Sequence, residues 1–456
     1  MKNNRKPLAL ALLQYPSGHH VAAWRQPGTD PKANISIDHY IASARAAEAA
    51  GFDITFIADR LGIPEGPIEA TRRVDEWSHG FEALSLATAI AASTERIGIV
   101  ATASTTFNEP YMLARQLASI DQISGGRLGW NIVTSGLSSE ATNFNPTNFH
   151  HDARYERAEE FIAVTRALWH SWDVSAFSRD KDSGVFFEAG ALREPGFQGK
   201  YFRALGGLNI LPSKQGHPVL VQAGASSAGR ALAARHADVI FAATPTLEQA
   251  IAYRQDLHFR RKAEGRSTDD LYILPGIFPV IGNTEVEARA KFDELQALIS
   301  TEVALALLGS YLGDVDLSGV DPHGPLPPLP VSNSIASRQA LLLDLAAREN
   351  LNVLQLARRI AGARGHWQIV GTPEQVAAEM IRWHEAGGAD GFMILPPTFP
   401  EGLDLFISSV VPILRERGLL SPIDFKGTLR ERLSLPFPHY DFSPNHEGQL
   451  QCEPSL

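Results

Sequence analysis

The sequence predicts an α/β protein that folds as a TIM-like (β/α)8 barrel with insertions, because eight short apolar runs alternate with helix-forming segments along its 456 residues. Unbroken apolar runs of this kind are typical of parallel strands that are buried on both faces. Eight such strands are the number that closes a barrel. The alternative, an open doubly wound sheet, would place a Gly-rich phosphate turn after the first strand, where this chain has none. The predicted strands are 8–13, 54–58, 97–101, 128–133, 219–221, 239–242, 272–278 and 391–395.

Helix signals separate these strands along the chain. Gly51 and Gly125 each end a predicted helix, since glycine is favoured just past a helix C-terminus. Thr372, Pro373 and Gln375 form the pattern of a capping box with proline in the first turn, which predicts a helix start there. The helix that Gly125 ends spans 111–124, and the other predicted helices lie at 82–94, 153–172, 247–263 and 285–300, with one directly after 226–229 and a last one that ends at Gly418.

Two long insertions interrupt the alternation. Residues 173–218 are irregular, with short strands predicted near 186–187 and 201–202. Residues 302–366 are Leu-rich but broken by five prolines, and we expect them to cover one end of the barrel. Both insertions are candidates for lids over an active site. The segment from about Leu420 is polar and Pro-rich, which predicts a tail that wraps the surface or a neighbouring subunit.

Composition limits the partners of the chain. The net charge of -10 gives no basic surface for nucleic acid or an acidic membrane, and no run of about 18 apolar residues could span a bilayer. The single Cys452 excludes an intrachain disulfide and a cysteine metal cluster. The apolar run behind the basic N-terminus is short for a signal peptide and no cleavage site follows it. We therefore expect a cytoplasmic protein with a small-molecule ligand, in one domain over 1–433 with a tail at 434–456.

The segment 219–236 contains a strand, a turn of small residues from Ala223 to Gly229, and a helix. Backbone N–H groups at a helix start lack intrahelical partners and carry the positive end of the helix dipole, so they bind anions, phosphate above all. Ser226 and Ser227 add hydroxyl donors, and the glycines let a ligand approach the backbone. The turn indicates a phosphate site, although serine also caps ordinary helices. It lacks the Lys of a P-loop, the full dinucleotide fingerprint and the closing glycine of a nucleophile elbow.

Residues that directly follow the strands would line the site, because in this fold the active site lies at the C-terminal ends of the strands. Asp59 is the only carboxylate among them, which argues against a two-carboxylate hydrolase. The pairs His19–His20 and His150–His151 lack the spacing or carboxylates of a metal site, so we expect no metal. A polar, nearly uncharged rim is typical of an enzyme whose cofactor carries the chemistry. The candidates are Gln14, Asp59, Thr105, Asn131, Thr134, Gln222, Ser226, Ser227 and Thr244.

Six motifs between about residues 8 and 433 resemble, in their order along the chain, the bacterial luciferase-like flavin monooxygenases, and the last three are similar to the branch of nitrilotriacetate, EDTA and dibenzothiophene-sulfone monooxygenases. They are 56–61 (FIADRL), 81–98 (from FEAL to TERIG), 125–135 (GGRLGWNIVTS), 151–155 (HDARY), 215–227 (QGHPVLVQAGASS) and 371–374 (GTPE). The resemblance implies a two-component monooxygenase. A separate NAD(P)H:flavin reductase would supply reduced FMN, and O2 would add to it to give a flavin C4a-peroxide that oxidises a small organic substrate.

The resemblance also implies a set of cofactor-binding residues. Tyr155 and the serine pair would hold the FMN phosphate from two helix starts, and no catalytic acid or base is predicted. The implied FMN contacts are Asp59, Thr105, His151, Tyr155 and Ser226, with Ser227 beside them, and Asn131 and Val133 would line the ring pocket.

Simpler roles stay open for these residues. Asp59 could cap a helix or pair with Arg60, and Tyr155 could be a packed aromatic. His151 could lie on the surface beside a helix, and Thr105 and Asn131 could satisfy loop backbone groups. His19, His20 and Trp24 lie in a loop that either faces the substrate or packs the barrel mouth.

Two other functions also stay open. One is a deazaflavin-dependent oxidoreductase of the same superfamily, which transfers hydride without oxygen, and the other is a flavin-binding protein without turnover. By analogy with the family we expect a homodimer or a homotetramer. The sequence does not identify the substrate.

Overall fold

The computed structural model describes residues 6–63, 67–75, 80–136, 138–144, 151–173, 175, 177–313, 315–329 and 336–438; for 138, 151, 152, 336–338 and 341 it describes the backbone alone. Cys452 and His150 lie outside the described residues.

Eight parallel strands close into a barrel, with the order β1-β2-β3-β4-β7-β8-β9-β11 and the first strand paired to the last. The predicted closed barrel is therefore confirmed. The strands are β1 (Ala9–Leu13), β2 (Ile54–Ile57), β3 (Gly98–Ser104), β4 (Leu128–Val133), β7 (Val219–Gln222), β8 (Val239–Ala242), β9 (Tyr272–Ile281) and β11 (Gly391–Ile394).

A ninth strand, β10 (Trp367–Gly371), pairs with the second half of β9 and was not predicted. Its partner β9 runs three residues beyond the predicted end, to Ile281, and is buried along its whole length. Because β9 outruns its barrel neighbours, its far half is free to pair with β10 outside the ring.

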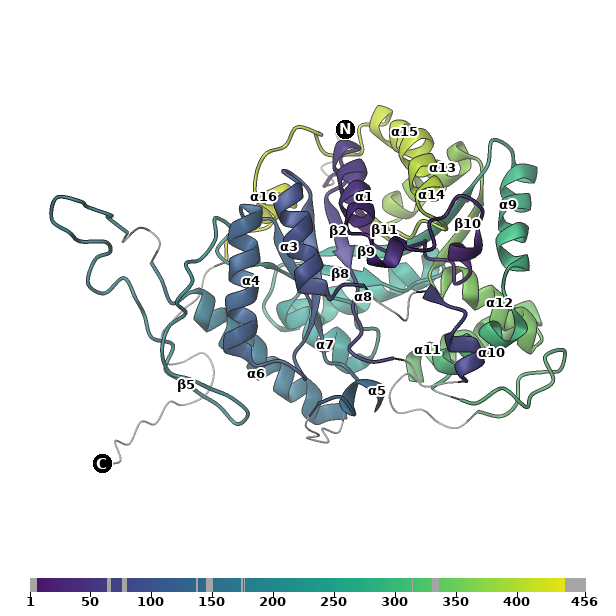
Figure 1. Ribbon diagram of the computed structural model, residues 1–456, viewed down its shortest axis with the longest axis horizontal. Helices are drawn as coiled ribbons and strands as arrows, with labels where there is room; N and C mark the ends of the chain where they lie inside the picture. Colours follow the sequence, from purple (N-terminus) through teal and green to yellow (C-terminus); the bar gives the residue numbers. More distant parts are fainter. Residues whose placement is uncertain are drawn as a thin grey trace.

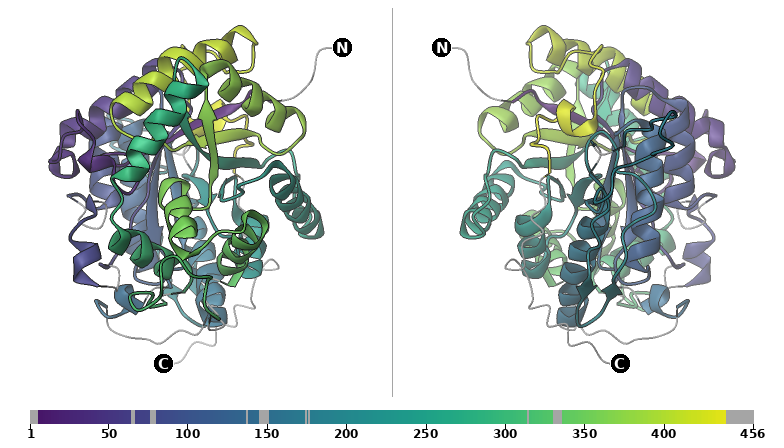
Figure 2. Two further views of the ribbon diagram at one scale, coloured as in Figure 1. Left: turned by 90° about the vertical axis from the view of Figure 1, so that its right-hand side faces the viewer. Right: turned by 90° about the vertical axis from the view of Figure 1, so that its left-hand side faces the viewer.

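Helices surround the barrel, and α16 lies at the end opposite to α5, α10 and α11 (Figures 1 and 2). The capping box at Thr372 is confirmed, with Thr372 Oγ1 accepting from Gln375 N and the Gln375 side chain accepting from Thr372 N. The helices are α1 (Ile37–Ala49), α2 (Ile68–Thr71), α3 (Ala83–Ser93), α4 (Pro110–Ser124), α5 (Ser138–Ala141), α6 (His151–Trp169), α7 (Ser227–His236), α8 (Leu247–Ala263), α9 (Glu285–Ala297), α10 (Thr301–Tyr311), α11 (Ala336–Glu349), α12 (Val353–Ala363), α13 (Pro373–Glu385), α14 (Glu401–Leu405), α15 (Val411–Glu416) and α16 (Leu429–Arg432).

The strands separate two apolar layers. In β4, Trp130 and Ile132 pack outward against the helices, and Trp130 lies 5.9 Å from Phe161 of α6 between ring centroids. Gly129 instead faces Val100 and Val221 inside the barrel. Because side chains alternate along a strand, Asn131 and Val133 also point to the inside, at the C-terminal end of β4.

The segment after Leu420 closes the other end of the barrel. Leu429 of α16 belongs to the interior cluster, and Arg432 forms a buried ion pair with Asp53, with Nε 2.7 Å from Oδ1. Arg430 pairs with Asp238 at 3.3 Å in the same region. The expectation that this segment wraps the surface is therefore wrong for α16, because the open barrel end buries Leu429, and Leu433 just after the helix, more fully than the outside would.

The two insertions lie in different places. The described part of 173–218 packs on the outside of α4 and α6: Gln122 of α4 donates from Nε2 to Leu211 O at 3.0 Å, and Glu160 of α6 accepts from Phe202 N. The segment then extends away from the barrel (Figure 1). It therefore does not cover the mouth, although we expected it to be a lid. By contrast, residues 302–366 reach the mouth, where Val21 N donates to Ala361 O.

The first insertion also differs from its predicted strands. Its two strands are β5 (Phe197–Gln198) and β6 (Arg203–Ala204), which pair antiparallel. The strand predicted near 186–187 is a bend, and the one predicted near 201–202 begins at Arg203. Among all the described residues, no helix combines the length and the apolar character needed to cross a bilayer.

Candidate functional site

The turn between β7 and α7 is built for close approach of backbone. A Cβ added to Gly229 would lie 3.1 Å from Gly224 Cα, and one added to Gly224 would lie 3.0 Å from Gly229 Cα. A side chain at either position would crowd the other glycine, so glycine at both positions favours the folding of this turn back on the first turn of α7. Tyr253 of α8 donates its hydroxyl to Gly224 O at 3.0 Å, and burial raises the pKa of Tyr253, so this support stays protonated.

Two helix starts meet at this turn. Ser226 is the N-cap of α7, and its Oγ accepts from Gly229 N at 3.0 Å. Tyr155, in the second turn of α6, brings its hydroxyl to 3.2 Å from the same Oγ. The structure therefore places together two of the three residues that were predicted to hold a phosphate, at the start of α7, and the first backbone N–H groups of a helix have no partner within the helix.

Ser227 and His151 are placed differently. Ser227 is exposed at the first position of α7, and its Oγ accepts from Arg260 at 3.4 Å. It lies next to Ser226 in sequence, but the hydroxyl that Tyr155 contacts is that of Ser226. His151 begins α6, and its side chain lies outside the described part.

The ends of β3 and β4 form the neighbouring wall. Asn131 is 4% exposed and donates from Nδ2 to Thr102 Oγ1 at 2.9 Å, whereas its Oδ1 has no hydrogen-bond partner among the described residues. A buried carbonyl oxygen without a donor costs free energy, so a bound ligand that donates there is favoured. Thr105 is fully buried, and both its N and its Oγ1 donate to Val133 O.

The carboxylate of Asp59 holds a helix start. Its Oδ2 accepts from Ala83 N, the first residue of α3, at 3.1 Å, and its Oδ1 accepts from Arg60 N at 2.7 Å. Asp59 therefore adopts the capping role that the sequence left open. It stays partly exposed at the end of β2, so capping and cofactor contact do not exclude each other.

Two residues of the predicted rim face away from the mouth. Gln14 is buried outside the barrel, where it donates to Thr55 Oγ1 and accepts from Ser43, both at 2.8 Å. Gln222 is buried as well, and its Oε1 accepts from Gly224 N at 2.6 Å. Both predictions fail because the first polar residue after an apolar run faces inward or outward according to strand register, which the run does not fix.

Several residues at the mouth were missed because they lie in the 302–366 insertion. His366 stacks on Phe241 of β8 with ring centroids 5.0 Å apart, and it lies 5.8 Å from His19. Arg364 extends over the Tyr15 ring at 5.4 Å. No motif marks these positions. The only available signal was their place directly before a strand, and that strand, β10, was itself not predicted.

The two histidines after β1 are buried and neutral. His19 is 2% and His20 is 1% exposed. Burial lowers the pKa of both imidazoles, and the charge of Arg364 lowers it further; the pKa of His20 falls to about 3. Of the two roles left open for this loop, packing at the mouth is the one these contacts show, while Trp24 donates from Nε1 to Arg73 O nearby.

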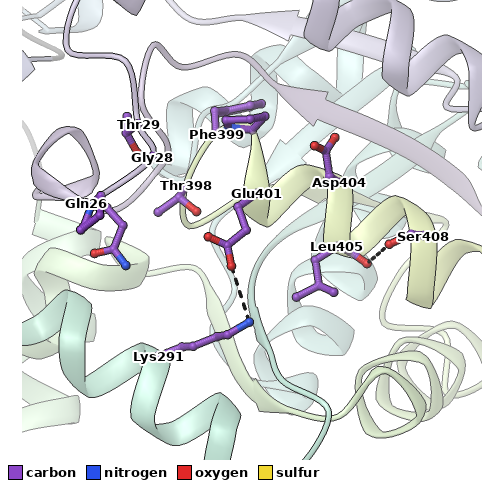
Figure 3. A pocket seen from close by; sticks show the side chains of 12 residues that line it. Gln26, Gly28, Thr29, Lys291, Thr398, Phe399, Glu401, Asp404, Leu405 and Ser408 are labelled. Carbon is purple, nitrogen blue, oxygen red and sulfur yellow. Dashed lines mark hydrogen bonds and ion pairs between the residues drawn. The ribbon is translucent and has the colours of Figure 1, made fainter.

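A separate hollow of about 430 Å³ lies beside the segment that follows β11. Figure 3 shows Gln26, Thr398 and Glu401 around it, with Lys291 of α9 in an ion pair to Glu401, Nζ to Oε1 3.6 Å. None of the predicted cofactor residues lines this hollow. Since its cation is already paired, we assign no cofactor to it.

The donor set at the mouth fits a flavin phosphate and ring. No group of three or more His, Cys, Asp or Glu side chains within the described residues could hold a metal. Tyr155, Ser226 and the start of α7 present hydrogen-bond donors, and Asn131 presents an unsatisfied acceptor. Flavin offers both an anion and ring N–H groups to such a set.

Comparisons with known proteins agree with these features. A family model described as Luciferase-like monooxygenase matches residues 17–390. N-acetyl-S-(2-succino)cysteine monooxygenase of Bacillus subtilis (strain 168) is 43% identical, covering 96% of this chain and 99% of the relative. Nitrilotriacetate monooxygenase component A of Aminobacter aminovorans is 40% identical, over 95% and 97%. Dibenzothiophene-sulfone monooxygenase of Rhodococcus erythropolis is 34% identical, over 96% of each.

Solved structures show the same similarity. DmoA from Hyphomicrobium sulfonivorans superposes with a TM-score of 0.86 at 33% identity, over 94% of this chain and 92% of that one. Riboflavin lyase RcaE, crystallised with a modified FMN and riboflavin, superposes with a TM-score of 0.84 at 31% identity, over 94% and 96%.

Proposed function

The chain belongs to the luciferase-like monooxygenase family, and from this premise we propose that it binds reduced FMN at the barrel mouth and uses O2 to oxidise a small organic substrate. Monooxygenases are named among its relatives over nearly their full length, including the nitrilotriacetate and dibenzothiophene-sulfone enzymes. When bound, reduced FMN would supply the electrons that activate O2. The residues of this chain then have to bind, orient and shield it.

The observation that carries the proposal is the contact between Tyr155 and Ser226. The two hydroxyls lie 3.2 Å apart where the starts of α6 and α7 meet, so both can donate hydrogen bonds to the oxygens of one phosphate group. The start of α7 adds backbone N–H groups and the positive end of its dipole. Ser227 is close enough in sequence to add a hydroxyl from the same helix turn.

The flavin ring would lie along β3 and β4. We propose that Asn131 Oδ1 accepts a ring N–H and that Val133 and Thr105 border the ring, with Asp59 at the end of β2. Asn131 and Thr105 are buried, so this wall keeps water from the reacting face. His151, at the start of α6, would approach the phosphate side.

Partners follow from the relatives. One relative is named component A of its system, which supports a separate flavin reductase as the supplier of reduced FMN. The riboflavin lyase structure, with its modified FMN, supports FMN as the form of flavin. We further propose a cytoplasmic homodimer or homotetramer by analogy with the family.

The decisive experiment supplies FMN, NADH and a flavin reductase and measures O2-dependent product formation for a panel of candidate substrates. The panel takes its compounds from the relatives: nitrilotriacetate, N-acetyl-S-(2-succino)cysteine and dibenzothiophene sulfone. Product that contains one atom from labelled O2 supports the proposal. Hydride transfer with a reduced deazaflavin and no O2 uptake would favour the deazaflavin alternative. Tight flavin binding without any product would favour a non-catalytic flavin-binding protein.

A further inference from the structure

Residues 177–196 of the first insertion form an arm that stands away from the barrel beside α4 and α6 (Figure 1). At the base of the arm, Asp173 N donates to Ala191 O at 2.9 Å. Near its tip, Asp180 N donates to Val185 O at 2.9 Å. Backbone hydrogen bonds at both ends therefore hold the arm as a hairpin, so it keeps a defined shape where it leaves the barrel.

Large apolar side chains are exposed along this arm. Val185 is 39%, Phe186 60%, Phe187 42% and Leu192 38% exposed, and Leu205 at the root of the arm is 41% exposed. These five residues, here called the arm surface, are one third of the fifteen large apolar side chains that are exposed among the described residues. Single exposed apolar residues are normal, but a group of them in one place marks an interaction site.

The aromatic rings of the arm cover one another only in part. Phe177 lies 5.2 Å from Trp172 and 5.7 Å from Phe187 between ring centroids. Phe186 lies 6.2 Å from Phe177. Even within this cluster, more than two fifths of each of the Phe186 and Phe187 side chains stays exposed. Burial of apolar surface stabilises a protein by about 25 cal/mol per Å², so a second surface that covers these rings is favoured.

The helix beside the arm extends this apolar region. Met112 of α4 is 49% exposed, and Arg115 donates to Met112 Sδ at 3.8 Å and to Asn209 Oδ1 at 2.8 Å. Asn209 follows the arm in the chain, so Met112 lies next to the root of the arm. From Ser178 to Asn209, 23 residues are exposed. A stable protein interface takes roughly 20 to 30 residues from each side, so the arm and its root can supply one side of it.

The charge of this region indicates which partner covers it. Residues 173–209 contain five basic and five acidic residues and are therefore neutral, whereas the whole chain has a net charge of -10. Two copies of the chain repel each other through their acidic surfaces, and the repulsion is smallest where neutral regions meet. A strongly charged partner finds no complementary net charge here. The region therefore fits a second copy of this chain better than nucleic acid or an anionic membrane.

We propose that the arm surface forms a two-fold contact between two copies of this chain, alone in a homodimer or as one of the contacts in a homotetramer. In a two-fold contact the same surface of each copy meets the other, so the Phe186 and Phe187 rings of both copies are buried in one interface. The hairpin is preformed, so association spends little free energy on ordering it. The inference rests on the oligomer proposed above and names its surface, and it is independent of the flavin site.

The test is the mass of the full-length chain in sedimentation equilibrium, without flavin or substrate. We expect the wild-type protein at two or four times the mass of one chain. Phe186→Asp with Phe187→Asp should halve that mass, because the interface would then bury unpaired like charges. Phe259→Asp is the matched control and should leave the mass unchanged, since Phe259 of α8 is 76% exposed and lies outside the arm surface.

Hydrogen–deuterium exchange of the same samples shows whether the double variant folds and whether the arm is covered. The amides of residues 178–190, all of them exposed in the single chain, should exchange at least about 10-fold more slowly in the wild-type protein than in the double variant. The amides of the barrel strands should exchange alike in both proteins if the double variant is folded.

A monomeric wild-type protein would overturn the inference, and this result needs no variant to fold. If that monomer gained mass only with the flavin reductase, the reductase would be the partner instead. A folded double variant that keeps the wild-type mass, or equal exchange of residues 178–190 in both proteins, would also overturn it. Failure of the proposed function looks different: the oligomer and its loss in the double variant would persist while O2 yields no product with FMN and any substrate.

Discussion

The Tyr155 hydroxyl of α6 lies 3.2 Å from Ser226 Oγ at the N-cap of α7, although the two residues are 71 positions apart in the sequence. The contact joins the starts of two helices that lie on neighbouring strands of the barrel, after β4 and after β7. It is the geometric basis of the proposed phosphate site, and it can be tested from both sides.

Tyr155→Phe removes one hydroxyl from this pair and keeps the ring. We expect FMN affinity to fall by about 10-fold or more, because a hydrogen bond to a charged group contributes about 1.5 to 3 kcal/mol. Fluorescence titration measures the change. Tyr201→Phe is the matched control, since the Tyr201 hydroxyl donates to Glu156 on the outer side of the same helix. If both variants bind FMN like the wild type, Tyr155 does not touch the phosphate.

Ser226→Asp with Ser227→Asp separates charge from folding. Asp is as good an N-cap as Ser, so α7 should stay intact, whereas Ser226→Ala should cost about 1 kcal/mol of unfolding free energy. We expect the Asp pair to weaken FMN binding by about 100-fold or more, through repulsion of the phosphate, and the corresponding Ala pair by about 10-fold. Urea unfolding and flavin titration on the same samples check both expectations. An Asp pair that binds as well as the Ala pair would refute the phosphate contact.

The barrel itself could be predicted because its strands are buried on both faces. A continuous apolar run such as Leu8–Leu13 is easily recognised as a buried strand. Gly125 marks the end of one helix, and the capping box at Thr372 marks the beginning of another. The strand β10 escaped prediction because it follows the insertion, where proline and leucine give no clear pattern. Likewise, the sequence of α16 predicted part of a surface tail. Its burial depends on the open end of the barrel, which only the folded structure shows.

The site could be predicted in part. Ser226 could be predicted from the turn of small residues that contains it, and Tyr155 from the resemblance to the flavin monooxygenases. The contact between the two side chains could be seen only in the folded structure. Gln14 and Gln222 were misplaced because the facing of a residue beyond a strand depends on register. Arg364 could not be found, since it follows a helix whose position only tertiary packing fixes.

Some motif residues serve the fold and not the site. Arg127, in the run of residues that resembles the flavin enzymes, donates to the carbonyl oxygens of Thr94 and Ile97 at 2.8 Å and 2.6 Å and locks the loop before β3. Gln215, in another motif, donates to Asp121 at 2.7 Å beneath the barrel. A motif match alone therefore does not separate catalytic from structural positions.

Arg432→Met tests the barrel closure by α16. The Arg432 and Asp53 side chains are only 2% and 3% exposed, so the variant leaves a buried carboxylate that keeps the Leu10 N–H at 2.8 Å and loses its paired charge. We expect a loss of about 3 to 5 kcal/mol in unfolding free energy at pH 7. Arg382→Met, which breaks an exposed pair, should cost less than about 1 kcal/mol. Equal losses in urea unfolding would mean that Arg432 does not hold the barrel end.

His20 predicts a pH dependence of stability. Its folded pKa of about 3 lies below the ordinary value of 6.5, so above pH 6.5 both states are neutral, and below it only the unfolded state gains the proton. Stability from this group is therefore lost as pH falls, by about 1.4 kcal/mol per pH unit between 6.5 and 3. Relative to His20→Gln, the wild type should lose about 2 kcal/mol between pH 7 and pH 5 without substrate. Parallel pH profiles of the two proteins would contradict a buried neutral His20.

The most direct test of the central claim, that the mouth holds the phosphate of reduced FMN at Tyr155 and Ser226, is an anaerobic titration with reduced FMN and with reduced riboflavin. The two flavins share the ring and differ in the phosphate. We predict that the wild-type protein binds FMN about 100-fold more tightly than riboflavin, and that this ratio collapses toward one in the Ser226→Asp, Ser227→Asp variant. Equal affinity of the wild-type protein for both flavins, or a ratio that survives the double substitution, would contradict the claim.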